Sequence, residues 1–135
     1  MEIYGRLAAA SPARYEPDLA ESLNNLSNHL GVSGDPQGAL DAIREAVEIY
    51  RRLAAASPVR YEPDLARSVL VMSDRLEEQG QTKRAIEATK EALQLMRPYA
   101  ERYPDSEHGR LYGVMQRDFA RLTGSEKPDT SDDSE

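Results

Sequence analysis

The stretch that decides the fold runs from Ala39 to Tyr50, reads A-L-D-A-I-R-E-A-V-E-I-Y, and returns in altered form between residues 85 and 96. Its apolar residues fall three or four positions apart, so in a helix they form one continuous stripe. Ala42, Ile49 and Leu53 make this stripe wider than a single partner helix can cover. The stretch therefore predicts a long helix that packs against other helices on more than one side.

The chain repeats itself at an offset of 46 residues. Residues 3–22 and 49–68 agree at 17 of 20 positions and share the pattern I-Y-x-R-L-A-A-A-S-P-x-R-Y-E-P-D-L-A-x-S. A third, weaker copy follows, in which Pro104 corresponds to Pro58. Self-similarity at a fixed period is typical of architectures in which each unit packs on the next. The sequence therefore predicts a modular fold.

Prolines divide each copy into elements. Pro12 and Pro58 are expected to end helices, because proline keeps its predecessor out of the helical region and cannot donate a backbone hydrogen bond. Pro17 and Pro63, which close the two R-Y-E-P segments, are expected at the first helical position of the next helix. Pro98 is expected to kink or loosen the helix that contains it.

The turns between these helices carry their own signals. Gly34 and Gly80 are expected in the left-handed conformation that closes a helix. Asp35 is expected to cap the next long helix, and Thr82 is the corresponding cap in the second copy. The predicted helices cover residues 2–11, 17–31, 36–57, 63–79, 82–102 and 106–123.

No strand period occurs in the sequence, so the fold class is all-α. Short loops between helices place successive helices antiparallel. We therefore expect an α-solenoid of stacked antiparallel helical hairpins with a period of about 46 residues. The expected parts are the second helix of a truncated repeat with its connector (1–16), two repeats (17–62 and 63–108), a C-terminal capping helix (109–124) and a disordered acidic tail (125–135).

The pattern L-x-x-L-S-x-x-L-x-x-x-G-x-x-x-x-A-L-x-x-I-x-x-A-V, from Leu23 to Val47, resembles a tetratricopeptide repeat. Ser27 is the small residue of that family, Gly34 its loop glycine, and Ala39 and Ala46 its packing alanines. The second copy repeats the pattern, with Ser73, Gly80, Ala85 and Ala92 in the corresponding positions. The family's usual period is about 34 residues; the longer unit here is similar to repeats of the kinesin light chain type and of large bacterial arrays.

The resemblance implies a protein–protein interaction scaffold, in which the first helix of each hairpin lines a concave groove for a partner protein or peptide. Asparagine suits such a groove because its side chain can donate and accept hydrogen bonds at once. Two alternatives stay open: Asn24 and Asn25 could be solvated fillers, and Leu70 and Val71 could be groove floor or core. The residues carried over to the groove are Glu21, Asn24, Asn25, Asn28, Arg67, Leu70, Val71, Asp74, Gln116 and Arg117.

The alternative function is self-association. The first residues correspond to the second helix of a hairpin, so Ile3, Tyr4 and Leu7 would lack a partner helix. Either the native array is longer than this chain, or the open face pairs with a second copy in a homodimer.

Composition excludes several other classes. The 135 residues contain no cysteine, which excludes disulfides, thiolate metal ligands and a cysteine nucleophile. The net charge is −7, of which residues 125–135 carry −4, so the body is nearly balanced and is a poor surface for nucleic acid. No signal-like segment and no apolar run of spanning length is present, so we expect no membrane partner and a cytoplasmic location.

No group of residues has the spacing of a catalytic or metal site. His29 and His108 lie far apart in the sequence and are expected to be solvated, as are Arg51, Arg52 and Arg60. Tyr15 and Tyr61 are either recognition aromatics or rings that pack over the turn between hairpins. We therefore expect no enzyme, no cofactor and no metal, and a helical hydrolase or nucleotide-binding domain is the third alternative.

Overall fold

The computed structural model describes the backbone of residues 12–124 and the side chains of residues 15–124. Within this range there is no strand, and the all-α prediction is confirmed. The predicted helix at 2–11, the tail 125–135, and Ile3, Tyr4 and Leu7 lie outside the described residues. The helices are α2 (Pro12–Ser33), α3 (Pro36–Ala56), α4 (Pro58–Glu78), α5 (Thr82–Arg102) and α6 (Glu107–Thr123).

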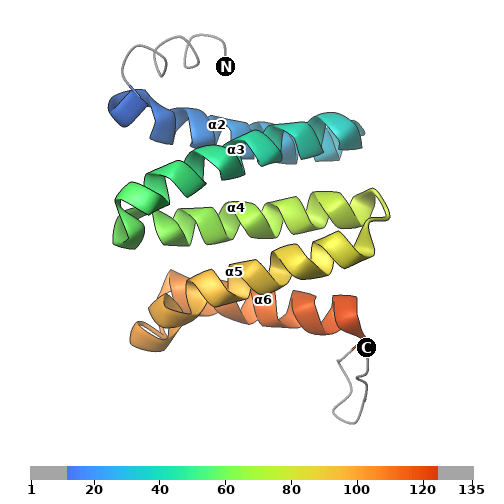
Figure 1. The fold of residues 1–135 in the computed structure, drawn as a ribbon. Coiled ribbons are helices and arrows are strands. Elements are labelled where there is room, and N and C mark those ends of the chain that lie inside the picture. The colour runs from blue at the N-terminus through green and yellow to red at the C-terminus, as the bar shows by residue number, and fades with distance from the viewer. Residues whose placement is uncertain (1–11, 125–135) are drawn as a thin grey trace.

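The five described helices follow one another in a stack, each running antiparallel to the one before (Figure 1). Each helix packs against its neighbours in sequence, and α4 also contacts both α2 and α6. Among the described helices, the backbones of α3 and α5 do not come into contact, nor do those of α2 and α6. The helices α2, α4 and α6 therefore lie on one side of the stack, and α3 and α5 lie on the other (Figure 1).

The two R-Y-E-P segments are helical, and the prediction that Pro17 and Pro63 open their helices is wrong. A single residue, Ser57, separates α3 from α4. The Ser57 N–H donates to the Leu53 carbonyl (2.8 Å), and the Ser57 carbonyl accepts from the Tyr61 N–H (3.1 Å). One helix therefore ends and the next begins at the same residue. The helix α4 consequently starts five residues earlier than the sequence predicts.

Prolines inside these helices are tolerated for local reasons. Pro58 stands at the first helical position, where a backbone N–H is not needed. Pro63 lies within α4 and removes one helical bond, to the carbonyl of Val59, which is 78% exposed and can be satisfied by water. Pro98 lies inside α5 near its end, and the helix continues through it to Arg102.

The turns agree with most of their sequence signals. Gly34 and Gly80 have φ of 92° and 76°, which confirms the left-handed conformation at both positions. Asp35 caps α3 by accepting a hydrogen bond from the backbone N–H three residues on (3.0 Å), also as predicted. The prediction for Thr82 is wrong: Gln81 occupies the cap position of α5 and makes no side-chain cap bond.

Each hairpin is held by the same buried hydrogen bond. The Ser27 hydroxyl donates to the Ala39 carbonyl (2.7 Å), and the Ser73 hydroxyl, 46 residues later, donates to the Ala85 carbonyl (3.0 Å). Both alanines are completely buried, as is Ala46. Small residues at these crossings allow the helix backbones to approach closely, so the pattern in the sequence corresponds to a repeated contact in the fold.

Polar contacts also join successive hairpins. Arg75 on α4 donates to the Ser27 carbonyl on α2 (3.3 Å), and Arg121 on α6 binds Glu77 on α4 (2.6 Å). Arg75 and Arg121 are 46 residues apart. Arginines one period apart therefore join successive hairpins, although the acceptor is a backbone carbonyl in the first contact and a carboxylate in the second.

The arginines expected to be solvated are exposed and also paired. Arg51 forms an ion pair with Glu91 on α5, and Arg52 binds Glu16 on α2 (2.7 Å). Ion pairs this exposed contribute about 0–1 kcal/mol each, so they set register more than stability.

Candidate functional site

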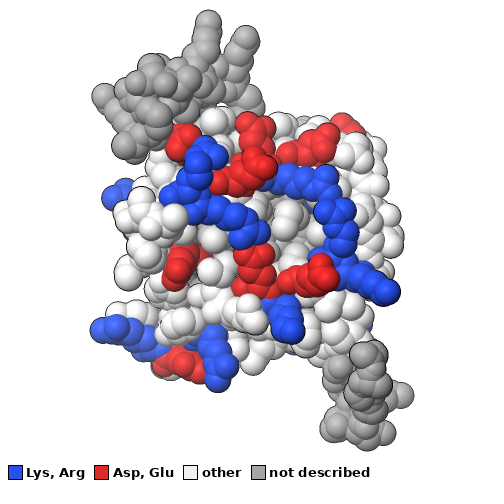
Figure 2. Space-filling view, viewed as in Figure 1, with Lys and Arg blue, Asp and Glu red and all other residues white. Residues whose placement is uncertain are grey.

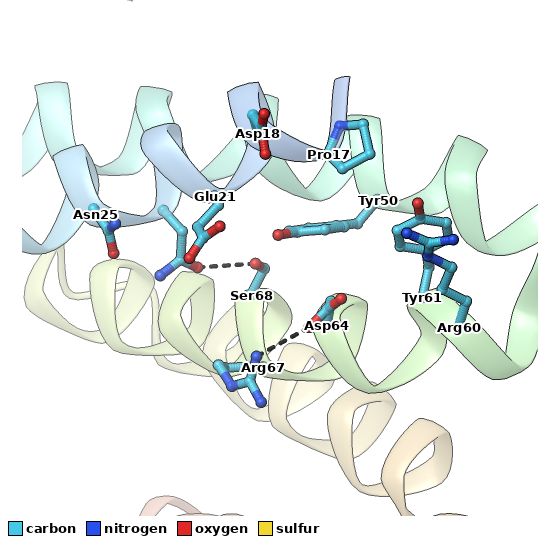
Figure 3. A pocket seen from close by; sticks show the side chains of 11 residues that line it. Pro17, Asp18, Glu21, Asn25, Tyr50, Arg60, Tyr61, Asp64, Arg67 and Ser68 are labelled. Carbon is cyan, nitrogen blue, oxygen red and sulfur yellow. Dashed lines mark hydrogen bonds and ion pairs between the residues drawn. The ribbon is translucent and has the colours of Figure 1, made fainter. Parts of the chain in front are cut away.

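A pocket of about 410 Å³ lies between α2 and α4, on the side of the stack where these helices contact each other (Figure 3). Both walls are polar, and α3 supplies the floor through Tyr50. The polar side chains of the walls are Asp18, Glu21, Asn24 and Asn25 from α2, and Asp64, Arg67 and Ser68 from α4.

Tyr50 forms the floor of the pocket and is buried. Only 7% of its surface is exposed, and its hydroxyl points into the space between the two helices (Figure 3). No group in the described chain forms a hydrogen bond with this hydroxyl. The pKa of Tyr50 is raised to about 12, mainly by burial and also by the charges of Asp64 and Glu21. The phenol is therefore neutral at physiological pH and can donate one hydrogen bond as well as accept.

Some of the wall residues are engaged within the protein. The Asn24 side-chain oxygen accepts a hydrogen bond from the Ser68 hydroxyl (2.8 Å), which ties α2 to α4 (Figure 3). Arg67 binds Asp64 (3.1 Å) and approaches Glu107 at the start of α6 (3.8 Å). The charge of Asp64 is thus largely compensated, and Asn24 keeps its amide hydrogens for a ligand.

Other wall residues make no ion pair with the side chains of residues 15–124. These are Asp18, Glu21 and Asn25, all of which are exposed. In Figure 3 the Glu21 side chain reaches down from α2 toward the space above α4. These groups are available to a ligand without breaking any contact of the fold.

The far end of the pocket is formed by Arg60 and Tyr61, whose side chains stack with the guanidinium 5.3 Å from the ring centroid (Figure 3). Tyr61 is half-buried and packs against the hydrophobic core. The ring therefore packs between hairpins, as one of the two sequence interpretations holds, and lines the pocket as well. Tyr15, its counterpart in the first copy, is also half-buried.

The remaining groove candidates lie outside the pocket. Asn28, Gln116 and Arg117 are exposed, the last two on α6. Leu70 is 7% exposed and belongs to the core, and Val71 is half-buried against it. Their burial therefore favours the interpretation that Leu70 and Val71 are core residues over the interpretation that they form the groove floor.

Asp74, on α4, is the carboxylate with the most perturbed environment. Burial raises its pKa to about 6, and the neighbouring charge of Asp118 on α6 acts in the same direction. Arg75 lowers the pKa only in part. Asp74 therefore carries a charge at neutral pH that its surroundings oppose.

Four of the groove residues predicted from the sequence line this pocket: Glu21, Asn24, Asn25 and Arg67. The sequence prediction does not include Asp18 and Asp64, which directly follow the prolines of the two R-Y-E-P segments. It also misses Tyr50, which fits the apolar stripe of its helix. The only available signal was that Tyr50 is the polar-tipped member of that stripe.

A second, smaller hollow of about 190 Å³ lies on the opposite side, between α3 and α5. Its floor is apolar, formed by Met72, Leu76 and Ala88, and its rim includes Arg44 and Glu87. Figure 2 shows this face, where positive and negative side chains alternate. No field of a single sign extends over it.

The histidines differ from each other. His29 is exposed, as predicted. His108 is half-buried rather than solvated, with its ring edge-on to Tyr99 at 6.1 Å between centroids. Within residues 12–124, no three His, Asp or Glu side chains are grouped so that they could hold a metal ion. None of the described helices combines the length and the apolarity that crossing a bilayer requires.

Comparison of this chain with protein-family models, with curated proteins and with solved structures finds no match. The function is therefore inferred from the repeat pattern and from the geometry of the pocket.

Proposed function

We propose that this chain is an α-solenoid of tetratricopeptide type that binds an extended segment of a partner protein along the face of α2, α4 and α6. Its role is that of an interaction scaffold, and it involves no catalysis. The observation that carries the proposal is the pocket between α2 and α4, where free polar groups from consecutive hairpins face one space.

The contact pattern supports the solenoid. A closed helical bundle would bring α2 against α5 or α6, whereas the described helices contact only their neighbours and the next helix but one on a single side. The buried Ser27 and Ser73 hydrogen bonds recur at the 46-residue period, and Arg75 and Arg121, one period apart, each bind the preceding hairpin. Recurrence of this kind is expected of a structure built from equivalent stacked units.

The chemistry of the face supports binding of an extended segment. A peptide backbone without secondary structure offers unpaired N–H and carbonyl groups, and it needs side chains that can donate and accept. Asn25 and Asn28 are exposed on one helix, one turn apart, and Asn25 lines the same pocket as Asn24 and Tyr50. Preformed helices hold these groups in place, which reduces the entropy lost on binding.

The experiment is a peptide-display selection on the full chain, followed by fluorescence anisotropy with the selected peptides. We expect the double variant Asn25→Ala/Asn28→Ala to weaken binding at least several-fold. Neither side chain forms a hydrogen bond within residues 12–124, so its loss should leave the fold intact. Gln94→Ala, which removes an exposed amide from α5 on the other side of the stack, is the matched control. Peptides that bind equally well to the double variant, or that are lost with Gln94→Ala, would contradict the proposal.

A further inference from the structure

The floor of the α2–α4 pocket holds a polar group that the fold does not use. Tyr50 is more than nine-tenths buried, with 7% of its surface exposed, and its hydroxyl has no hydrogen-bond partner in the described chain. A phenol in a protein interior normally finds a partner, because leaving a buried polar group unsatisfied is unfavourable. Here the hydroxyl is directed into the pocket (Figure 3), where only solvent or a ligand can reach it.

The charges around this hydroxyl are unequal. Three carboxylates and two arginines line the pocket, and one carboxylate, Asp64, is already paired with Arg67. Arg60 is stacked on Tyr61 at the far end. The space in front of Tyr50 is therefore bordered by Asp18 and Glu21, two carboxylates with no ion pair among the side chains of residues 15–124.

We infer that this pocket receives a cationic side chain, a lysine or an arginine, from the segment that the proposed groove binds. The charged head lies between Asp18 and Glu21 and donates hydrogen bonds to their carboxylates. Tyr50 contributes its oxygen as an acceptor at the floor, and the phenol ring supports the aliphatic stem. A volume of about 410 Å³ accommodates one such side chain with its neighbouring backbone.

The same place in the next hairpin has different chemistry. At an offset of 46 residues, Tyr50 corresponds to Met96 and Glu21 to Arg67. Met96 is completely buried and has no hydroxyl to offer, and Arg67 replaces the carboxylate that a cation would need at that place. The inferred subsite is therefore specific to the first interface, and it fixes the register in which a partner segment lies on the array.

The first measurement is an NMR titration of the full chain with small probes. The cationic probes are Nα-acetyl-arginine methylamide and Nα-acetyl-lysine methylamide. The citrulline analogue is the neutral control of the same shape, and the glutamate analogue is the anionic control. We expect the cationic probes to bind with dissociation constants of roughly millimolar size and to shift amides of residues 17–25, 48–52 and 60–68. Citrulline should bind at least about tenfold more weakly, since it lacks the charge.

Variants identify the groups involved. Glu21→Gln is expected to weaken the arginine probe about tenfold, and Tyr50→Phe about fivefold, because each removes one hydrogen bond to the cation. Glu48→Gln, an exposed glutamate of α3 outside the pocket, removes the same charge and should change nothing. Thermal melting of Tyr50→Phe, which deletes only the hydroxyl, verifies that the fold is kept.

The inference rests on the proposed function, but the two fail differently. The cationic subsite would be overturned if the probe shifted amides near carboxylates outside the pocket. It would also be overturned if Glu21→Gln left the affinity for the arginine probe unchanged. If selected peptides bind along α2 and α4 without preferring arginine to citrulline, the groove stands and the subsite is wrong. If the arginine probe occupies the pocket but no peptide binds, the subsite chemistry stands and the proposed groove is wrong.

Discussion

Replacing Asp74 by Asn is expected to stabilise the protein at neutral pH and to have almost no effect near pH 4. The pKa of Asp74 is raised from 3.8 to about 6, first by burial and then by the charge of Asp118 across the α4–α6 contact. Glu77 and Glu78 act in the same direction, and only Arg75 opposes them. Asparagine has nearly the same shape as the protonated carboxyl and carries no charge to bury.

The sign follows from proton binding. Between about pH 4 and pH 6 the native state holds a proton at Asp74 that the unfolded chain has already released, so the free energy of unfolding falls as pH rises through this window. One pKa unit corresponds to about 1.4 kcal/mol, which gives about 3 kcal/mol as an upper limit above pH 6. Because Asp74 is only partly buried, solvent reduces this, and we expect Asp74→Asn to gain about 1–2 kcal/mol at pH 7.

Urea unfolding followed by circular dichroism at pH 4, 5, 6, 7 and 8 measures the effect by linear extrapolation. The informative quantity is the difference between variant and wild type, in which the titration of all other groups cancels. The matched control is Asp105→Asn, a change at an exposed aspartate in the turn before α6. Its difference in free energy of unfolding from wild type should not change with pH. Two results would refute this prediction for Asp74→Asn: a difference in free energy of unfolding that does not change with pH, or a loss of stability at pH 7. Either would mean that Arg75 holds the Asp74 carboxylate in its charged form.

Three further predictions, the first with a control variant, concern the packing and are tested by thermal and urea unfolding. Gly109→Ala should lose about 1–3 kcal/mol, because a Cβ would lie 2.0 Å from the Pro104 carbonyl oxygen; Gly113→Ala, in the same helix with no contact closer than 3.7 Å, should gain about 0.5–1 kcal/mol, and equal effects would contradict this. Ala46→Leu should lose about 1–3 kcal/mol by overpacking a fully buried crossing, which an unchanged midpoint would disprove. Ser73→Ala should lose about 1 kcal/mol with its buried hydrogen bond to α5; a neutral effect would show that the bond is not stabilising.

The sequence predicts α3 and α5 to within a residue at each end, because their boundaries depend on local chemistry. Asp35 caps α3, and Gly34 and Gly80 adopt the backbone conformation that only glycine accepts easily. The start of α4 could not be predicted in the same way. Pro58 and Pro63 are both suited to open a helix, and local signals do not choose between them.

Packing makes that choice. With α4 beginning at Pro58, the segment that contains Tyr61 becomes helical, and the ring packs half-buried against the core. The structure gives up the one helical bond that Pro63 cannot make, at a site where water can replace it, and gains apolar burial in return. Burial of an aromatic side chain stabilises by about 1.5–3 kcal/mol, which is more than a single exposed hydrogen bond contributes.

Part of the candidate site was predictable from the resemblance to a tetratricopeptide repeat. The resemblance carries Glu21, Asn25 and Arg67 over to one surface, and all three line the pocket. The role of Tyr50 could not be predicted, because periodicity assigns the whole side chain to the core. Whether its hydroxyl meets protein or open space depends on how far apart α2 and α4 stand, and that distance is set by the packing of α2, α3 and α4 together.

The repeat itself locates where specificity resides. Residues 3–22 and 49–68 differ at only three positions, and one of these is Glu21 against Arg67. The fold accepts either residue at this place on the helix, so packing does not require the glutamate. Tyr50 and Met96 likewise fill equivalent buried positions, although methionine replaces the phenol ring and its hydroxyl by a flexible thioether. Both differences fall in one pocket, and both make its first copy more attractive to a cation than the second. Exchanging the pair, Glu21→Arg with Tyr50→Met, should therefore keep the stack folded and abolish the preference for a cationic probe.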